Sequence, residues 1–388
     1  MRRRLSGPGL AAVAAGLTLL AAGCSSSGSG GATTAKPAHQ AAAAAATTAP
    51  VSMVSSVQTT GATWATIPMG ATAGPNEFWQ LFTRTTGSSR WTLHTPPDVA
   101  TNGALVLAGT GATLTAGVRP SIDLTFSPVA STANGGQSWT TSPPQTGLAN
   151  HPDALAAAAD GHLIAAGQDN RVSVLAPSGA SWSALTSKQT LAAVAPACEL
   201  TSLTAVAYDP AGTPLAAGNC GRPGTVGIFS ETGSRWQLAG PTLPAALRSQ
   251  PVQVLRLTRT GAGDVALIQA GTSLIAAWST DGGHWTLSGA EKTAGAAPVA
   301  AAFGVKNQIA VALAGGRAET IVGPGSAWQA LPVLPAGHSV ELALPADGSM
   351  QALAADGGTL TVWQVTGGRW AKVQTIKVPI QYGSSSGS

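Results

Sequence analysis

The chain is short of charge, and this shortage excludes several kinds of partner. Only 9% of its 388 residues are charged, with 20 Lys and Arg against 16 Asp and Glu. Arg2, Arg3 and Arg4 supply three of the four net positive charges, so the remainder is almost neutral. A nucleic-acid-binding surface needs clustered Lys and Arg to neutralise phosphates. We therefore expect no nucleic-acid partner and no polybasic contact with a membrane surface.

Residues typical of catalytic and metal sites are also few or scattered. The chain has two tyrosines, and its six histidines form no His-x-x-x-His pair. Paired glycines lie beside expected strands rather than before helices, so they predict no phosphate-binding loop. We expect no cofactor and no metal site, and a non-catalytic role is favoured over an enzymatic one. The histidines are His39, His94, His151, His162, His284 and His338.

The apolar run nearest the start of the chain is too short to span a membrane. Arg2–Arg4 precede an apolar run from Leu10 to Leu20, and small residues then lead to Cys24. This order is typical of an export signal. The Ala-Ala-Gly-Cys ending resembles the lipobox of bacterial lipoproteins. That resemblance implies cleavage before Cys24, acylation of its thiol, and anchoring on the extracytoplasmic face of the cell membrane. An ordinary secreted signal is the alternative.

Composition divides the chain into four segments. Residues 1–23 form the signal peptide, and residues 24–50 are a Ser/Gly/Ala/Thr-rich flexible linker that begins at the lipidated cysteine. Residues 51–382 contain the folded domain, and residues 383–388 form a disordered tail. With Cys24 assigned to lipid, Cys198 and Cys220 remain as a pair. An oxidising compartment favours a disulfide between them, which contributes roughly 3 kcal/mol. Two buried free thiols are the alternative.

A glycine-containing turn followed by tryptophan recurs along the folded domain. Successive tryptophans lie 42 to 54 residues apart, with short apolar runs and Gly or Pro punctuation between them. Short strands repeated at this period predict an all-β fold, a seven-bladed β-propeller, with six or eight blades as alternatives. The repeat tryptophans are Trp91, Trp139, Trp182, Trp236, Trp285, Trp328 and Trp370.

The turn before each tryptophan resembles the Asp-box, or BNR repeat, of sialidases and related secreted propellers. Residues 132–139 follow its pattern with Asn134 in place of Asp, residues 279–285 follow it one residue short, and the other copies are more degenerate. In an Asp-box the Asp or Asn accepts hydrogen bonds from turn amides, and the tryptophan packs between sheets. The resemblance therefore implies structural roles for the seven tryptophans.

Sialidase activity itself finds little support in the sequence. That family uses an arginine triad and a tyrosine–glutamate pair. Tyr208 lies inside an apolar run and Tyr382 lies near the tail, so neither fits the catalytic pattern. Four arginines fall at turns or strand edges, where solvated side chains are expected: Arg84, Arg90, Arg235 and Arg369.

These observations favour a binding role for the domain. We expect a monomeric, membrane-anchored propeller that serves as a non-catalytic binding platform for an envelope protein partner. A glycan-binding module and a divergent sialidase-like glycosidase are the alternatives. Trp79, in the aromatic cluster of residues 78–82, could stack on a sugar or partner, or could cap the core. A glycosidase would need two carboxylates about 5–9.5 Å apart in the central channel. Four aspartates are too dispersed in the sequence to nominate such a pair: Asp123, Asp153, Asp209 and Asp264.

Overall fold

A computed structural model describes most of the folded domain. Contacts divide the chain into Met1–Thr47 and Thr48–Ser388, and the described residues all lie in the second unit. Within them, no helix has the length and apolar character needed to cross a membrane. The predictions for the signal peptide, Cys24, the linker, Tyr382 and the tail lie outside the described residues. The described ranges are 56–70, 77–96, 105–118, 129–141, 152–177, 179, 181–296, 298–337 and 339–378.

The described strands form seven four-stranded antiparallel meanders, in which each strand pairs with the next along the chain. The fourth and fifth meanders join into one larger sheet through the pairing of Cys220 with Val252. The first three meanders are β1 (Ser56–Thr59), β2 (Ala62–Gly70), β3 (Glu77–Thr85) and β4 (Thr92–Leu93); β5 (Leu105–Thr110), β6 (Thr113–Val118), β7 (Val129–Thr132) and β8 (Thr140–Thr141); and β9 (Pro152–Ala157), β10 (Leu163–Gly167), β11 (Arg171–Leu175) and β12 (Ser183–Ser187).

The other four meanders follow the same order. The fourth is β13 (Leu200–Tyr208), β14 (Pro214–Cys220), β15 (Gly227–Thr232) and β16 (Arg235–Leu238); the fifth is β17 (Val252–Thr260), β18 (Gly263–Ala270), β19 (Ser273–Ser279) and β20 (Trp285–Leu287), with β21 (Glu291–Lys292) also paired to β19. The sixth is β22 (Pro298–Phe303), β23 (Ile309–Leu313), β24 (Ala318–Ile321) and β25 (Gln329–Ala330), and the seventh is β26 (Ser339–Ala343), β27 (Gln351–Asp356), β28 (Thr359–Thr366) and β29 (Arg369–Lys377).

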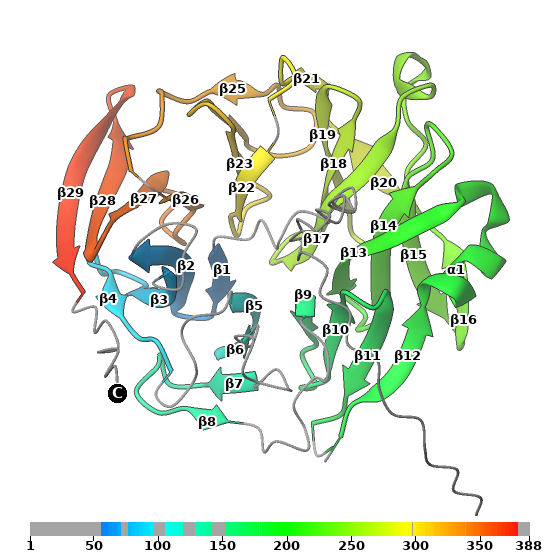
Figure 1. Ribbon diagram of the computed structural model, residues 1–388, viewed down its shortest axis with the longest axis horizontal. Helices are drawn as coiled ribbons and strands as arrows, with labels where there is room; N and C mark the ends of the chain where they lie inside the picture. The colour runs from blue at the N-terminus through cyan, green and yellow to red at the C-terminus, as the bar shows by residue number, and fades with distance from the viewer. Residues whose placement is uncertain are drawn as a thin grey trace, which may run out of the picture. The chain divides into compact units, whose positions relative to one another are not determined.

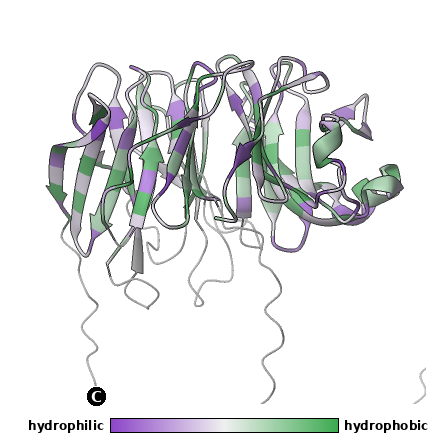
Figure 2. Cartoon of the chain, turned by 90° about the horizontal axis from the view of Figure 1, so that it is seen from above, coloured by the Kyte–Doolittle hydropathy of each residue, from purple (hydrophilic) through white to green (hydrophobic). Residues whose placement is uncertain are grey.

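The meanders are arranged around a central channel. Figure 1 shows the first strand of each meander nearest the centre and the fourth nearest the periphery. Each apolar cluster in the core joins two neighbouring meanders, and one cluster joins Ala65 and Phe82 of the first to Leu353 and Val362 of the seventh. Seen from the side, apolar residues recur along the strands (Figure 2). The fold is therefore the all-β propeller that the repeat predicts.

Side chains connect the first and seventh meanders across an interface that we call the seam, formed by β1–β4 and β26–β29. The Trp91 indole N–H donates to Gln351 Oε1 at 2.8 Å, and the Gln374 amide both accepts from and donates to the backbone of Trp91. The Arg84 guanidinium forms a 2.6 Å ion pair with Asp347. Arg84 is 7% exposed, so the expectation that it is solvated is wrong: Asp347, 263 residues away, draws it into the seam.

Every repeat tryptophan lies between the third and fourth strands of its meander or at the start of the fourth. Each one packs in an apolar cluster that contains residues of the preceding meander, or of the seventh meander for Trp91. Several indole N–H groups donate across this boundary, from Trp285 to the Ala239 carbonyl at 2.8 Å and from Trp370 to the Pro332 carbonyl at 3.0 Å. The tryptophans therefore hold neighbouring sheets together.

In two of the turns before these tryptophans, a side-chain oxygen accepts hydrogen bonds from turn amides. Asn134 Oδ1 accepts from the Ser138 amide at 3.0 Å, and Asp281 Oδ1 accepts from the amides of Gly283 and His284 at 2.9 and 2.8 Å. Gly282 adopts a φ of +71°, which glycine tolerates without strain. The side-chain oxygens thus stabilise tight turns.

A short helix interrupts the β pattern between the third and fourth meanders, and the repeat gives no sign of it. Helix α1 (Lys188–Val194) starts where the Ser187 hydroxyl accepts a hydrogen bond from the Thr190 amide, as an N-cap does. The 3-10 turn η2 (Pro196–Cys198) follows, and a disulfide joins Cys198 to Cys220 at the end of β14. The predicted disulfide is therefore present. A second 3-10 turn, η3 (Ala245–Leu247), lies between β16 and β17.

Candidate functional site in the central channel

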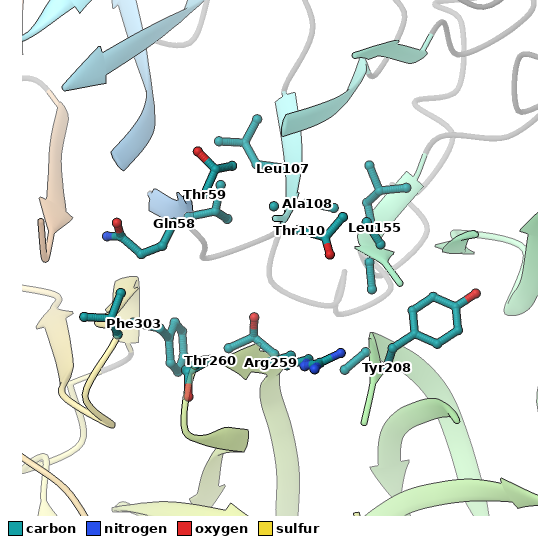
Figure 3. Close-up of a pocket in the computed structure, with 18 of the residues that line it drawn as sticks. Gln58, Thr59, Leu107, Ala108, Thr110, Leu155, Tyr208, Arg259, Thr260 and Phe303 are labelled. Carbon is teal, nitrogen blue, oxygen red and sulfur yellow. The ribbon is translucent and has the colours of Figure 1, made fainter. Parts of the chain in front are cut away.

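The inner strands surround a cavity of about 420 Å³. Residues of β1, β5, β9, β13, β17 and β22, together with the turns that follow these strands, line it. A Cβ added at Gly109 would collide with the Gln58 carbonyl oxygen, so glycine at this position allows β5 to approach β1 closely. Figure 3 shows Gln58, Thr59 and Thr110 on one side of the cavity and Thr260 and Phe303 on the other.

One end of this cavity opens to solvent. Its exposed lining residues lie at or just beyond the carboxyl ends of inner strands, and they are Thr60, Gly111, Ala159, Arg259 and Gly261. The Thr60 amide donates to the Gly111 carbonyl at 2.5 Å, which fixes the first two hairpins against each other at this mouth. The wall is therefore held by hydrogen bonds between meanders.

Gln58 is the most firmly placed polar side chain in the wall. Its Nε2 donates to the Leu344 carbonyl at 2.5 Å, and its Oε1 accepts from the Thr63 hydroxyl at 2.8 Å. Both ends of the amide are thus engaged, and the contact to Leu344 spans the seam. We infer that Gln58 supports the shape of the channel.

Arg256 is the most unusual residue of the lining. It lies on β17 opposite Leu267, beside a β-bulge at residues 254–256, and it is only 4% exposed. Its Nε has no hydrogen-bond partner, and its guanidinium forms no ion pair within the part of the chain that the structure describes. Burial lowers the pKa of Arg256 to about 10. This desolvated cation in the channel wall therefore has no counter-ion among the described residues.

Arg259 supplies a second cation at the mouth of the cavity. It is exposed, and it pairs along the strands with Asp264 of β18. The Asp264 carboxyl is fully buried, and neither of its oxygens has a hydrogen-bond partner. Burial raises the pKa of Asp264 to about 8, and the nearby Asp209 and Asp281 add to this while Arg259 opposes it. Asp264 is therefore mainly neutral near pH 7 and does little to balance Arg259.

Tyr208 borders the cavity but belongs mainly to the core. It is 3% exposed and packs in the cluster of the third and fourth meanders. Burial, followed by the charges of Asp160 and Glu231, raises the pKa of its hydroxyl well above the usual range. The Tyr208 side chain is therefore a neutral wall group at physiological pH.

A second cavity of about 550 Å³ lies between the second and third meanders. Its lining contains hydroxyl and apolar groups and no charged side chain among the described residues. Lacking a charged group to orient a ligand, it is a weaker candidate than the channel.

Trp79, the stacking residue proposed from sequence, and the aspartates judged too dispersed to form a catalytic pair do not gather in the channel. Trp79 is half-buried and packs in the cluster of the first and second meanders, so its role as a binding residue stays a prediction. Asp209 and Asp264, which looked too dispersed to pair, are close enough for their charges to interact. Neither lines the cavity. Arg90, Arg235 and Arg369 are exposed, as expected. Asp123 lies outside the described residues.

The histidines are likewise dispersed. His162 and His284 contact the aspartates of their own turns at 2.9 and 2.6 Å, and His94 stacks edge-on against Trp64. Within the described ranges, no group of three or more His, Cys, Asp or Glu side chains could hold a metal ion. His39, His151 and His338 lie outside the described residues.

The reasoning from sequence missed Arg256. A charged residue between Leu255 and Leu257, inside the apolar run of an inner strand, was the available signal. Its 4% exposure and its place in the cavity wall depend on the folded arrangement of the strands, which the run itself does not reveal.

No protein-family model matches the sequence, and no match was found among the curated proteins. Solved structures do resemble the fold. The chain is similar to a 6-phosphogluconolactonase-like protein from Bacteroides uniformis, with 12% identity, a TM-score of 0.53, and coverage of 82% of this chain and 97% of the other. The corresponding protein from Bacteroides fragilis gives 14% identity, a TM-score of 0.50, and coverage of 81% and 95%. YCF48 from Cyanidioschyzon merolae gives 16% identity, a TM-score of 0.48, and coverage of 77% and 98%. At these identities, the likeness to the two Bacteroides structures shows a β-propeller fold and no more.

Proposed function

We propose that this chain is a non-catalytic binding platform, tethered by a lipid on Cys24 to the outer face of a bacterial cytoplasmic membrane, that binds an envelope protein partner at the open end of its channel. The observation that carries the proposal is the cavity lining. Its polar groups are backbone, hydroxyl, amide and arginine groups set among apolar side chains, and no Asp, Glu, His or Cys is present among the described residues that line it. Such a lining can orient a ligand by hydrogen bonds and charge.

The rigidity of the wall supports a binding role. The inner strands are linked around the channel by contacts such as Gln58 to Leu344 and Thr60 to Gly111. A wall held in this way loses little conformational entropy when a partner binds, which favours affinity.

The anchoring part of the proposal rests on the sequence alone. The basic start, the apolar run and the Ala-Ala-Gly-Cys ending support lipid attachment at Cys24. A Ser/Gly/Ala/Thr-rich segment of residues 25–50 would then allow the propeller to move relative to the membrane, with a reach of roughly 30 Å.

Cross-linking of the lipidated protein on intact cells tests the function. Recovery of one or two stoichiometric envelope proteins supports the platform. Recovery of glycan alone contradicts it. Cys24→Ser is the matched variant for anchoring, and we expect it to move the protein from the membrane fraction to the medium.

A glycan-binding role is the second candidate, because two arginines line the channel. No tryptophan is among the described lining residues, so the stacking surface typical of sugar sites is missing from that part of the wall. Retention of the purified protein on peptidoglycan, with no protein partner cross-linked, would favour this candidate.

A further inference from the structure

A buried cation without a partner is expensive to maintain in a folded protein. Removing a guanidinium from water costs several kcal/mol unless a counter-charge and hydrogen bonds replace the lost hydration. Arg256 is 4% exposed, and its Nε has no acceptor. No carboxylate is among the described residues that line the cavity beside it. The fold therefore keeps unused donors at the wall of a cavity that solvent can reach.

We propose that the central channel binds a small oxyanion, a carboxylate or a phosphate group, and that Arg256 is its main donor. This proposal rests on the proposed binding function and names the chemistry of what the channel recognises. The planar guanidinium presents its N–H groups as a fork that matches two oxygens of either group.

The charge of the channel supports an anion. Arg256 and Arg259 both line the cavity, and the acidic residue paired with Arg259 along the strands is Asp264, which is largely protonated near pH 7. Asp153 of β9 and Glu341 of β26 also lie on inner strands, but they are engaged in other interactions and do not line the cavity. The cavity therefore carries two positive charges with little compensation.

The size of the cavity supports a small ligand. A volume of about 420 Å³ falls within the range typical of small-molecule sites, roughly 300–1,000 Å³. The exposed Arg259 at the mouth would attract an anion from solution, and the buried Arg256 would then hold it where water no longer competes. The anionic group could belong to a free metabolite or to an acidic group on the protein partner.

Anion-dependent thermal unfolding of the full-length chain tests the inference. Sodium phosphate and sodium citrate are titrated at pH 7 against sodium chloride of equal ionic strength. We expect a saturable rise in Tm with phosphate, citrate or both, because a ligand that binds only the folded state stabilises it. Isothermal titration calorimetry of the same anions provides the dissociation constant. Binding of citrate alone assigns a carboxylate ligand, and binding of phosphate alone assigns a phosphate.

Three variants separate specific binding from general salt effects. Arg256→Met should abolish the saturable shift, and Arg256→Lys, which keeps the charge and loses the fork, should weaken binding at least about tenfold. Arg235→Met removes an exposed arginine and should leave the shift unchanged. If Arg256→Met does not fold, the anion affinity of Arg256→Lys, compared with that of the wild type by calorimetry, still tests the role of Arg256.

Two results would overturn the inference: equal shifts in the wild type and Arg256→Met, or no calorimetric binding of either anion. If neither anion binds but a cross-linked protein partner is recovered, the inference about the anion fails and the binding platform is still supported. Anion binding without any cross-linked partner would support the anion site and contradict the protein-binding platform. Loss of both anion binding and cross-linking in Arg256→Met would place the anionic group on the partner.

Discussion

Arg84 in the seam and Arg256 in the channel are both buried arginines, yet their surroundings differ completely. Arg84 donates from Nε to the Ser88 carbonyl at 2.7 Å, from Nη1 to Ser349 Oγ at 3.1 Å, and from Nη2 to Asp347 at 2.6 Å. Arg256 has no such partners among the described residues. The N–H groups of Arg84 are used by hydrogen bonds within the fold, whereas those of Arg256 stay available for a ligand. Burial alone therefore does not distinguish a structural arginine from one placed to bind a ligand.

The largest expected effect concerns a third buried ionisable group, Asp264, which also lacks partners. Because burial raises its pKa to about 8, it stays protonated in the folded state while the unfolded chain ionises near pH 4. Its stabilising contribution is therefore complete below pH 4 and is lost as the pH rises toward 8. We expect Asp264→Asn to raise the free energy of unfolding by about 4 kcal/mol at pH 7 and by little at pH 4.

Urea denaturation at the two pH values measures this difference. Glu199→Gln, at an exposed acidic position, is the control and should show no comparable pH dependence. A gain from Asp264→Asn that is equal at both pH values would show that Asp264 is not the group that titrates.

The second effect tests the structural arginine. We expect Arg84→Met to lower the free energy of unfolding by about 2 kcal/mol, since three charge-assisted hydrogen bonds at the seam are lost. Chemical denaturation measures the loss. Arg90→Met, an exposed neighbour in the same turn region, should change stability by less than about 0.5 kcal/mol.

The third effect has the opposite sign and tests the contrast between the two arginines directly. In chloride buffer without other anions, Arg256→Met should raise the free energy of unfolding by about 1 kcal/mol, because an apolar side chain replaces an uncompensated buried cation. A loss similar to that of Arg84→Met would mean that Arg256 has a structural role, and the contrast would fail.

The smallest effect concerns His284 and Asp281, an exposed pair that contrasts with the buried ionisable groups above. The hydrogen bond from His284 to Asp281, at 2.6 Å, together with the charge of that carboxylate, raises the pKa of His284 above its ordinary value. Asp281→Asn should return the pKa of His284 toward 6.5. An NMR titration of the imidazole shows the change, with His162, beside Asp160, as the internal reference. An unchanged pKa of His284 would show that the contact does not persist in solution.

The architecture was largely predictable from the sequence because its signals are local. The Gly-containing turns before Trp139 and Trp285 specify their hydrogen bonds within a few residues, and the tryptophan spacing indicates the repeating meanders. Helix α1 was missed because one capping serine, Ser187, inside a polar connection gives little signal by itself.

The candidate site was not predictable, for a physical reason. Arg84 and Asp347 meet across 263 residues, and Arg256 is buried on an inner strand at the wall of the cavity. The local sequence pattern around Arg256 shows that a charged residue interrupts an apolar run. It does not show whether a carboxylate from a distant strand will meet that residue.

The seam has a consequence for how the molecule is made. Its two sides come from the first and last described strands, and no strand is exchanged between the first and seventh meanders among the described residues. During synthesis, therefore, the apolar face that contains Ala65 and Phe82 has no partner until Leu353 and Val362 have emerged. Closure of the ring between these two meanders has to wait for the seventh meander. A product truncated before Ser339 would retain six meanders with two uncovered apolar faces, which makes it a substrate for chaperones, proteases or aggregation.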